Sequence, residues 1–359
     1  MRRWLLLVVL VALFLAPNPV TAGYVVTNLA SDLDMGPGVF QDPDMINPWG
    51  LTVRGASPFW IANNGTGVAT LYNTSSAAAV KQGLVVTVGS GAPITGTVGN
   101  LSSSFNGDLF LFAAENGGIY GWRAALGTTA ETLLSPTSSS VYKGLAINGS
   151  TLYAANFSSG AIDVFAGGFG SPLHLVDPTL PQGFGPFGMQ LLNGKIYVTF
   201  AMQDAAKHDD DPGPGRGFVD VLDPTTNLLT RLISRGSLDS PWGLAIAPAN
   251  FGELSGDLLV GNFGDGLINA FGANTGASRG TLDDASGNPI QIDGLWALMF
   301  GNGAAAGPTN RLFFTAGIQG EDHGLFGVID PAPEPGSLAL LTMGLLGLAA
   351  CRRRHPGPP

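Results

Sequence analysis

Short apolar runs recur along the chain between residues 24 and 330, and each is bounded by Gly, Asn or Pro. Their apolar positions are continuous or alternate with polar ones, which is the pattern of short β-strands. The runs come in successive groups, and each group opens on a phrase centred on a glycine, as in Pro48-Trp49-Gly50-Leu51. The residues before this glycine in the six groups are Trp49, Thr95, Lys143, Phe187, Trp242 and Asp293.

The phrases are separated by intervals of 46, 48, 44, 55 and 51 residues. Periods of about 40–50 residues with strand-like content are typical of β-propellers, in which each repeat forms one blade. The six copies therefore predict an all-β, six-bladed β-propeller. The sixth copy lacks a fourth strand, and the segment 24–29 has no partner in the first blade. We expect this N-terminal strand to pair with the last blade and close the ring, which removes exposed sheet edges.

Composition agrees with a folded body rich in turns. The chain has 359 residues with 53 Gly and 25 Pro, while 45% of its residues are hydrophobic and 12% are charged. Between its basic ends, the body carries 11 basic against 25 acidic residues, a net charge of −14, so nucleic acid is excluded as a partner. The single cysteine, Cys351, lies in the C-terminal tail and excludes both an intrachain disulfide and a cysteine nucleophile in the body.

The N-terminus predicts a secretory signal peptide over residues 1–22. Arg2 and Arg3 precede the apolar run Trp4–Ala16, and the small-residue sequence Val20-Thr21-Ala22 follows. This order is that of a signal peptide, and the run is shorter than the roughly 20 residues that a membrane span needs. We expect cleavage by signal peptidase after Ala22, with a membrane anchor as the alternative.

The C-terminus combines a short polar motif, an apolar stretch and a basic end. The motif is Pro333-Glu334-Pro335, and the apolar stretch Leu338–Ala350 follows it. The basic cluster after this stretch is Arg352, Arg353 and Arg354. This segment, 332–359, resembles the PEP-CTERM sorting signal of bacterial exported proteins. The resemblance implies a transmembrane helix that anchors the chain transiently, an exosortase-type protease as partner, and a final location at the cell surface or outside the cell. A plain tail anchor is the alternative.

The body itself, residues 23–331, also resembles a known family. The resemblance rests on NPWGL at 47–51, YKGLAI at 142–147, SPWGL at 240–244 and GLWAL at 294–298. These stretches are similar to a family of uncharacterised exported bacterial proteins that often carry the same sorting signal. The resemblance implies an architecture and a location, but no activity.

Residues at equivalent repeat positions gather around the channel mouth of a propeller, where ligands bind. The candidate ligand-binding residues are therefore Trp49, Lys143, Phe187, Trp242 and Asp293. Lys143 and Asp293 fall in opposite blades. They are a catalytic pair, a grip for a zwitterionic or sugar ligand, a plain ion pair, or two separately solvated groups in a wet channel. His323, beside two carboxylates in the sequence 319–323, is a candidate general base or part of a turn.

A second set of positions follows the second strand of each repeat and suggests a metal site. Asn63, Glu115, Asn156 and Asn262 offer the oxygen ligands that Ca²⁺ prefers, whereas Ala201 and Gly317 at the remaining positions offer no side-chain ligand. Asparagine equally suits the turns at strand ends. The long acidic loop 203–217 is a lid, a calcium site or a mobile solvated segment.

Two functions follow from these observations. The first is an exported surface or matrix propeller that binds a small molecule, glycan or protein at the channel face. The alternative is a divalent-metal-dependent, lactonase-like hydrolase that uses the Asn and Glu ligands. No Gly-x-Ser-x-Gly or His-Glu-x-x-His motif is present, so whether the chain is an enzyme stays open.

Overall fold

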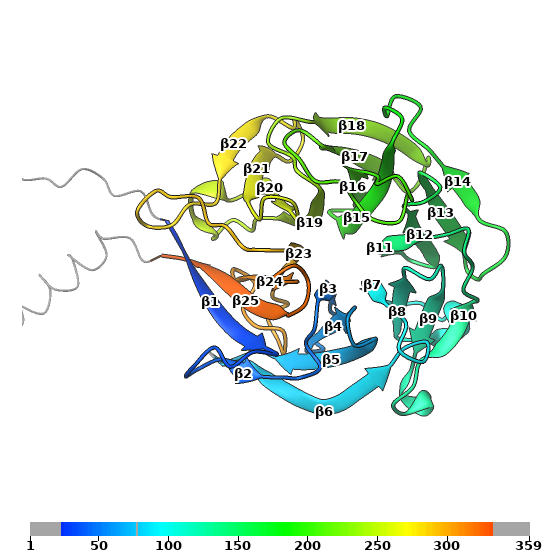
Figure 1. Ribbon diagram of the computed structural model, residues 1–359, viewed down its shortest axis with the longest axis horizontal. Helices are drawn as coiled ribbons and strands as arrows, with labels where there is room; N and C mark the ends of the chain where they lie inside the picture. The colour runs from blue at the N-terminus through cyan, green and yellow to red at the C-terminus, as the bar shows by residue number, and fades with distance from the viewer. Residues whose placement is uncertain (1–22, 77, 333–359) are drawn as a thin grey trace, which may run out of the picture.

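Six β-sheets surround a central axis in the computed structural model, which describes residues 23–332 with the exception of residue 77 (Figure 1). Each sheet forms one blade, so the predicted all-β, six-bladed β-propeller is confirmed. Helical structure in the described residues consists of three short 3₁₀ turns, η1 (Phe105–Gly107), η2 (Ala124–Leu126) and η3 (Gly252–Leu254). No helix in this part of the chain is long and apolar enough to cross a bilayer.

The first three blades follow the chain in order, with four strands each. Blade one consists of β3 (Pro48–Thr52), β4 (Phe59–Asn63), β5 (Val68–Asn73) and β6 (Val80–Thr87). Blade two consists of β7 (Ile94–Gly99), β8 (Phe110–Ala114), β9 (Ile119–Trp122) and β10 (Glu131–Leu134). Blade three consists of β11 (Tyr142–Asn148), β12 (Thr151–Asn156), β13 (Ala161–Ala166) and β14 (Leu173–Leu175).

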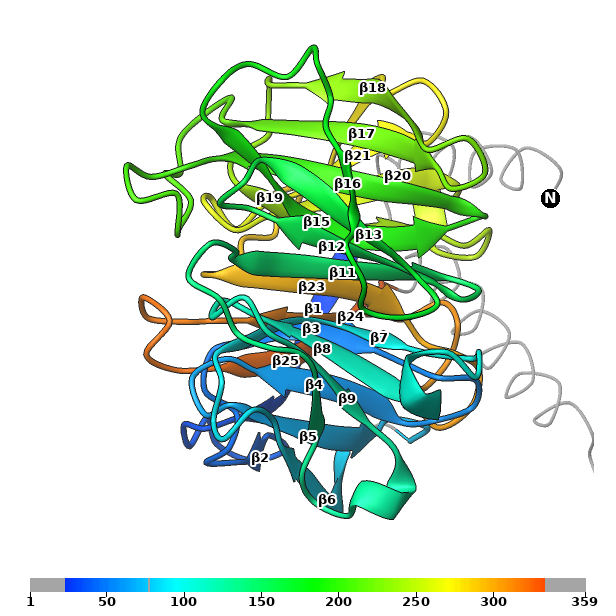
Figure 2. The same ribbon diagram turned by 90° about the vertical axis from the view of Figure 1, so that its right-hand side faces the viewer.

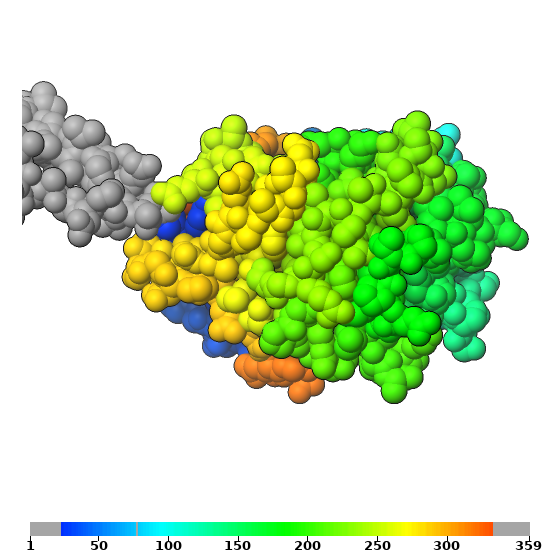
Figure 3. Space-filling view, turned by 90° about the horizontal axis from the view of Figure 1, so that it is seen from above, coloured from blue at the N-terminus to red at the C-terminus, as the bar shows by residue number. Residues whose placement is uncertain are grey.

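The last three blades complete the ring. Blade four consists of β15 (Phe184–Leu192), β16 (Lys195–Met202), β17 (Gly217–Asp223) and β18 (Leu228–Ser234). Blade five consists of β19 (Pro241–Ile246), β20 (Asp257–Asn262), β21 (Ile268–Gly272) and β22 (Ser278–Thr281). Blade six combines β23 (Leu295–Phe300), β24 (Leu312–Ala316) and β25 (Leu325–Pro331) with β1 (Tyr24–Ser31) and β2 (Phe40–Gln41) from the start of the body. In the space-filling view of Figure 3, blades four and five, coloured green to yellow, form one continuous side of the molecule.

The N-terminal strand closes the ring, as predicted. β1 pairs antiparallel with β25, from Tyr24 opposite Pro331 to Ser31 opposite Leu325, with one bulge near Asn28. The strand is two residues longer than the predicted segment 24–29. β2 then adds to β1 as a short parallel strand. Figure 2 shows the blades of the closed ring from the side. Five of the six buried apolar clusters each lie between two neighbouring blades. The sixth joins the interface of blades one and six to aromatic side chains on the central axis.

The repeated glycine lets each inner strand approach the next one closely. A Cβ at Gly144 would lie 2.5 Å from the carbonyl oxygen of Phe187 in the next blade, closer than packed atoms allow. Each inner strand also carries a β-bulge at this phrase, for example between Tyr142 and Leu145. The bulge turns the residue before the glycine toward the axis, so the six phrases create one ring of side chains.

The sixth member of that ring differs from the prediction. The bulge of blade six lies between Leu295 and Leu298, and a Cβ at Gly243 would lie 2.6 Å from the carbonyl oxygen of Trp296. The sixth phrase is therefore Trp296-Ala297-Leu298, with alanine in place of the glycine. The prediction for Asp293 was wrong because Gly294 is a turn glycine with a φ of +60°, and it lies three residues before Ala297, which holds the true repeat-glycine position.

Candidate functional site

The ring residues at the start of the inner strands fill the channel with aromatic side chains. Trp49 stacks on Trp296 with ring centroids 3.6 Å apart and meets Trp242 and Phe187 edge-on at 6.4 Å and 6.3 Å. None of these four side chains is more than 8% exposed. We call them the aromatic plug. Trp49, Phe187 and Trp242 thus meet at the predicted mouth, but they close the channel rather than line an open cavity.

Lys143 belongs to the same ring and lies against the plug. Its side chain is 1% exposed, and its Nζ lies 4.9 Å from the ring centroid of Trp49. The ammonium bonds to a carboxylate oxygen of Glu115 and, at 3.0 Å, to Oδ1 of Asp209. Burial alone would lower the pKa of Lys143, but the two carboxylates outweigh burial and raise it. Lys143 therefore stays charged, with Glu115 and Asp209 rather than Asp293 as its partners.

Asp293 itself is exposed and lies outside the ring. Its Oδ2 accepts a hydrogen bond from the backbone N–H of Gln319 at 2.7 Å. This bond fixes the turn that follows β24. The structure therefore does not bring Lys143 and Asp293 together as a pair.

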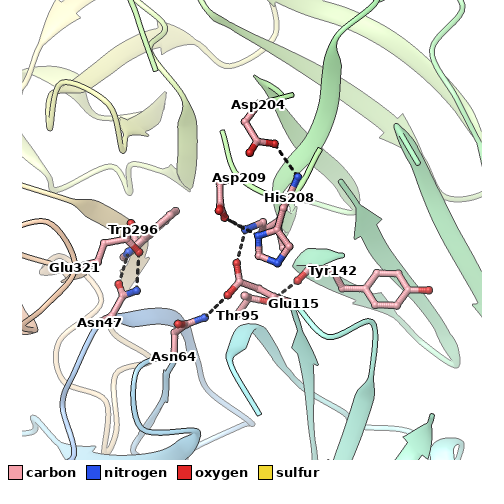
Figure 4. A network of polar contacts seen from close by, with 11 residues as sticks. Asn47, Asn64, Thr95, Glu115, Tyr142, Asp204, His208, Asp209, Trp296 and Glu321 are labelled. Atoms are coloured by element: carbon pink, nitrogen blue, oxygen red, sulfur yellow. Dashed lines mark hydrogen bonds and ion pairs between the residues drawn. The ribbon is translucent and has the colours of Figure 1, made fainter. Parts of the chain in front are cut away.

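Four carboxylates surround Lys143, and they come from equivalent loops of alternate blades. Each loop joins the second and third strands of its blade, in blades two, four and six. The members of this carboxylate cluster are Glu115, Asp209, Asp210 and Glu321. Figure 4 shows Glu115, Asp209 and Glu321 converging on one region from three sides. We call this end of the channel, with Lys143 and the carboxylate cluster, the lysine mouth.

Amide side chains hold two of these carboxylates in place. Asn64 Nδ2 donates to Glu115 Oε2 at 3.0 Å, and Asn47 Nδ2 donates to Glu321 Oε2 at 2.6 Å. Asn47 is fixed in turn by the indole N–H of Trp296, which donates to its Oδ1 at 3.0 Å (Figure 4). The aromatic plug therefore supports the polar layer above it through a direct hydrogen bond.

Burial changes the acidity of the cluster. It raises the pKa of Asp210 to about 6, in spite of the nearby charge of Lys143. Burial also raises the pKa of Glu321, and the charges of Glu115 and Asp210 add to this effect. For Asp209, burial acts to raise the pKa, but the Lys143 ammonium and His208 outweigh it and lower the pKa. The cluster thus combines a firmly ionised carboxylate with two that hold protons more tightly than usual.

The predicted metal ligands are not brought together. Three asparagines bond within their own blades, since Asn63 Nδ2 donates to Val68 O at 3.0 Å, Asn156 Nδ2 to Asp163 Oδ2 at 2.9 Å and Asn262 Nδ2 to Asp265 Oδ1 at 3.0 Å. Only Glu115 faces Lys143. The predicted metal set mixed two different positions of the repeat. In blades one, three and five the asparagine lies opposite the first residue of the inner strand. In blade two Ala114 holds this position. Glu115 therefore lies one residue beyond the position of the asparagines.

A different trio, Glu115, His208 and Asp209, places its ligand atoms within 4.8 Å of one another. A divalent cation does not fit this trio, because the Lys143 ammonium already bonds to both carboxylates. His208 Nδ1 in turn lies 3.0 Å from Asp209 Oδ1. The ammonium of Lys143 thus occupies the electrostatic role that a metal ion would have.

His323, the candidate general base, faces the N-terminal segment. Its Nδ1 lies 2.6 Å from Asp32 Oδ2, and the other oxygen of Asp32 accepts the N–H of Gly324 at 2.8 Å. These contacts connect β1 to the loop before β25. His323 therefore helps to hold the N-terminal segment on blade six, and it does not contact Lys143 in the described part of the chain.

Sequence reasoning missed most of the residues around Lys143. Asn47 and Asn64 were not singled out, while Asp209, Asp210 and Glu321 were noted only as parts of acidic loops. The available signal was the recurrence of acidic residues in the same loop of blades two, four and six. That signal becomes visible only once the strand register is known.

The fold and the sequence together define the class of this protein: it is a β-propeller with a sorting motif at its C-terminal end. The PEP-CTERM protein-sorting motif matches residues 331–354, which confirms the predicted sorting motif. The predicted signal peptide and the C-terminal transmembrane segment lie in residues 1–22 and 333–359, outside the described residues.

Relatives place the body in a family. "Uncharacterized protein R648" of Acanthamoeba polyphaga mimivirus is 32% identical over 311 residues, covering 80% of this chain and 76% of the viral protein. "Uncharacterized protein L690" of the same virus is 31% identical over 283 residues, covering 72% and 74%. The chain belongs to the family of these two proteins.

Solved structures share the architecture. A luciferin-regenerating enzyme matches with a TM-score of 0.54 and 13% identity, covering 87% of this chain and 98% of that chain. A streptogramin B lyase matches with a TM-score of 0.53 and 12% identity, covering 86% and 98%. At this identity the likenesses show the fold alone.

Proposed function

We propose that this protein is exported, sorted to the cell surface or extracellular matrix by an exosortase-type protease, and binds a polar ligand at the lysine mouth. The sorting motif at residues 331–354 supports export and sorting. The resemblance of the body to exported bacterial proteins agrees with the same location. In this view the C-terminal segment anchors the chain in the membrane until it is processed.

The convergence of four carboxylates around one buried lysine is the observation that carries the binding proposal. Ionised carboxylates only accept hydrogen bonds, and two of the three N–H donors of Lys143 are already directed to Glu115 and Asp209. Asp210 Oδ2 and the nearby Ser240 Oγ have no hydrogen-bond partner other than each other in the described residues. The mouth therefore offers acceptors, and its ligand should supply donors. Among the ligands predicted for this face, a glycan or another hydroxyl- or amine-bearing molecule fits best.

A binding screen on residues 23–332 tests the proposal. Purified body is applied to a glycan array and a panel of polyols and amines, and hits are measured by calorimetry. We expect Glu321→Gln to weaken binding about tenfold, because it removes an anionic acceptor. Glu253→Gln makes the same chemical change at an exposed position on η3 and should leave the affinity unchanged. Equal affinity in both variants would place the ligand elsewhere on the protein.

The alternative is the metal-dependent, lactonase-like hydrolase, for which Glu115, His208 and Asp209 are the only grouped metal-ligand side chains among the described residues. The position of the Lys143 ammonium argues against it, because a second cation beside it would be repelled. Metal analysis and thermal melts with Ca²⁺ or EDTA separate the two functions. We expect no bound metal and no calcium-dependent shift in melting temperature. A clear calcium stabilisation of the unmodified protein would reverse this preference.

A further inference from the structure

A pocket opens at the other end of the channel, where the inner strands finish. Its volume is about 350 Å³, and β3, β7, β11, β15 and β23 or the residues directly after them form its walls. Along β11, Ile147 lies four residues beyond Lys143, which is about 13 Å in an extended strand. The pocket is therefore separate from the lysine mouth. We call it the open mouth; it is lined by Thr52, Val53, Thr97, Val98, Gly99, Leu101, Leu145, Ala146, Ile147, Gly149, Gln190, Leu191 and Met299.

No Asp, Glu, Lys, Arg or His is among these lining residues. Two of the three hydrogen-bonding side chains are engaged within the protein. Thr97 Oγ1 donates to Leu111 O at 3.0 Å, and Thr52 Oγ1 accepts from the N–H of Gly99 at 3.2 Å. Gln190 is the remaining polar side chain. The other lining side chains are aliphatic except for Met299, and Gly99 and Gly149 contribute backbone to the walls.

This lining selects against charged ligands and sugars. An ion would lose its hydration without finding an opposite charge, which is costly. A sugar would find no aromatic ring on which to stack and few hydrogen-bond partners. An aliphatic or weakly polar molecule instead gains from leaving water. The volume lies near the lower end of the range of about 300–1,000 Å³ for ligand pockets, so the occupant is small.

The pocket has a closed floor. Deeper along the axis, the next cavity has a volume of only about 10 Å³, which is roughly the space of one water molecule. The walls of this narrow part include Trp242 of the aromatic plug. A molecule that enters the open mouth therefore stops there. At the rim, Leu101 is 76% exposed and presents further apolar surface to an incoming ligand.

We propose that the open mouth binds one small, neutral, predominantly apolar molecule, with Gln190 orienting its polar end. This site is independent of the function proposed for the lysine mouth. Either site can exist without the other, because neither Lys143 nor any member of the carboxylate cluster lines the open mouth.

N-phenyl-1-naphthylamine, a neutral apolar dye whose fluorescence rises in apolar surroundings, is the probe. We expect saturable binding to residues 23–332 with one site and a dissociation constant in the micromolar range. Leu191→Trp fills the pocket and should raise the dissociation constant at least about tenfold. Ile246→Trp is the matched control, because Ile246 holds the equivalent position on β19, is equally half-buried, and does not line the pocket.

A surface variant keeps the test valid if the tryptophan variants fold poorly. Leu101→Asp adds a charge at the exposed rim and should weaken the neutral dye severalfold, while Leu228→Asp, at another exposed leucine, should not. The sulfonated relative of the dye, 1-anilinonaphthalene-8-sulfonate, should bind at least about tenfold more weakly, because the pocket offers no cation. Three results would each overturn the proposal. They are dye binding that does not saturate, an equal loss of dye affinity in a pocket variant and its control, and tighter binding of the anionic dye than of the neutral one.

Discussion

The two mouths of the channel differ in almost every respect, although the same inner strands form both. The lysine mouth holds a buried ammonium and four carboxylates above a closed aromatic plug. The open mouth is a pocket of about 350 Å³ without a charged lining residue. The difference arises from the loops, because the lysine mouth receives its four carboxylates from loops between second and third strands. A propeller thus offers two chemically independent surfaces on one axis.

The largest effect should come from replacing the charged centre of the lysine mouth. Lys143→Met leaves the carboxylate cluster without its cation, and we expect the free energy of unfolding to fall by about 3–5 kcal/mol. Calcium should recover part of this loss, because Glu115 and Asp209 then face an empty cation position. Chemical denaturation with and without Ca²⁺ measures both effects.

Lys195→Met is the control for that variant, since Lys195 pairs with Asp223 at the surface and is 47% exposed. It should change stability little and give no calcium response. If Lys143→Met were as stable as the control variant, the ammonium would not be the electrostatic centre of this mouth. Dye binding at the open mouth should survive in whatever fraction stays folded.

The connection between plug and polar layer should give the next largest effect. Trp296→Phe removes the indole N–H that donates to Asn47 and leaves a buried acceptor unpaired. We expect a loss of about 1–3 kcal/mol in unfolding free energy beyond the effect of side-chain volume. Trp60→Phe, a buried tryptophan on β4 away from the plug, provides the volume term. Equal losses in the two variants would show that the hydrogen bond contributes nothing.

The mouths should also respond differently to pH. Burial raises the pKa of Asp210 to about 6, so the folded protein binds a proton that the unfolded chain releases. Stability is therefore lost as pH rises through about 6, by about 1 kcal/mol between about pH 5 and pH 7. Asp210→Asn should flatten this dependence in denaturation experiments. Dye binding at the open mouth should stay constant, and a pH-dependent dye affinity would contradict the separation of the two mouths.

The smallest effect is expected for Asp293→Asn. Asparagine retains the oxygen that accepts the N–H of Gln319, and position 293 lies outside the ring. Stability should change by less than about 0.5 kcal/mol, and ligand affinity at the lysine mouth should be unchanged. A marked loss of affinity would restore the predicted partnership between Asp293 and Lys143.

The architecture was predictable because it depends on local patterns. Strand alternation and a period near 50 residues determined the number of blades, and the unpaired segment 24–29 indicated how the ring closes. The register error in blade six came from a substitution, since Ala297 replaces the ring glycine while Gly294 serves a turn. A single sequence does not distinguish these two uses of glycine.

The site was predictable only in part, because loops carry no periodic signal. Lys143 was selected from its repeat position, but Glu115 lies 28 residues away and Asp209 lies 66 residues away in the chain. Their approach depends on how loops of blades two and four bend over the axis. The open mouth was not predicted, since its lining residues are ordinary core positions whose shared cavity appears only in three dimensions.

The pairing of Tyr24 with Pro331 brings the two ends of the described body together at one place on the propeller. The first and last strands meet at the outer edge of blade six, and the sorting motif begins at residue 331, directly at this edge. Residue 331 is separated from the inner strand β23 by β24, so anything that holds the chain at this residue is attached away from the central axis. Both mouths lie on that axis and therefore stay clear of the attachment point.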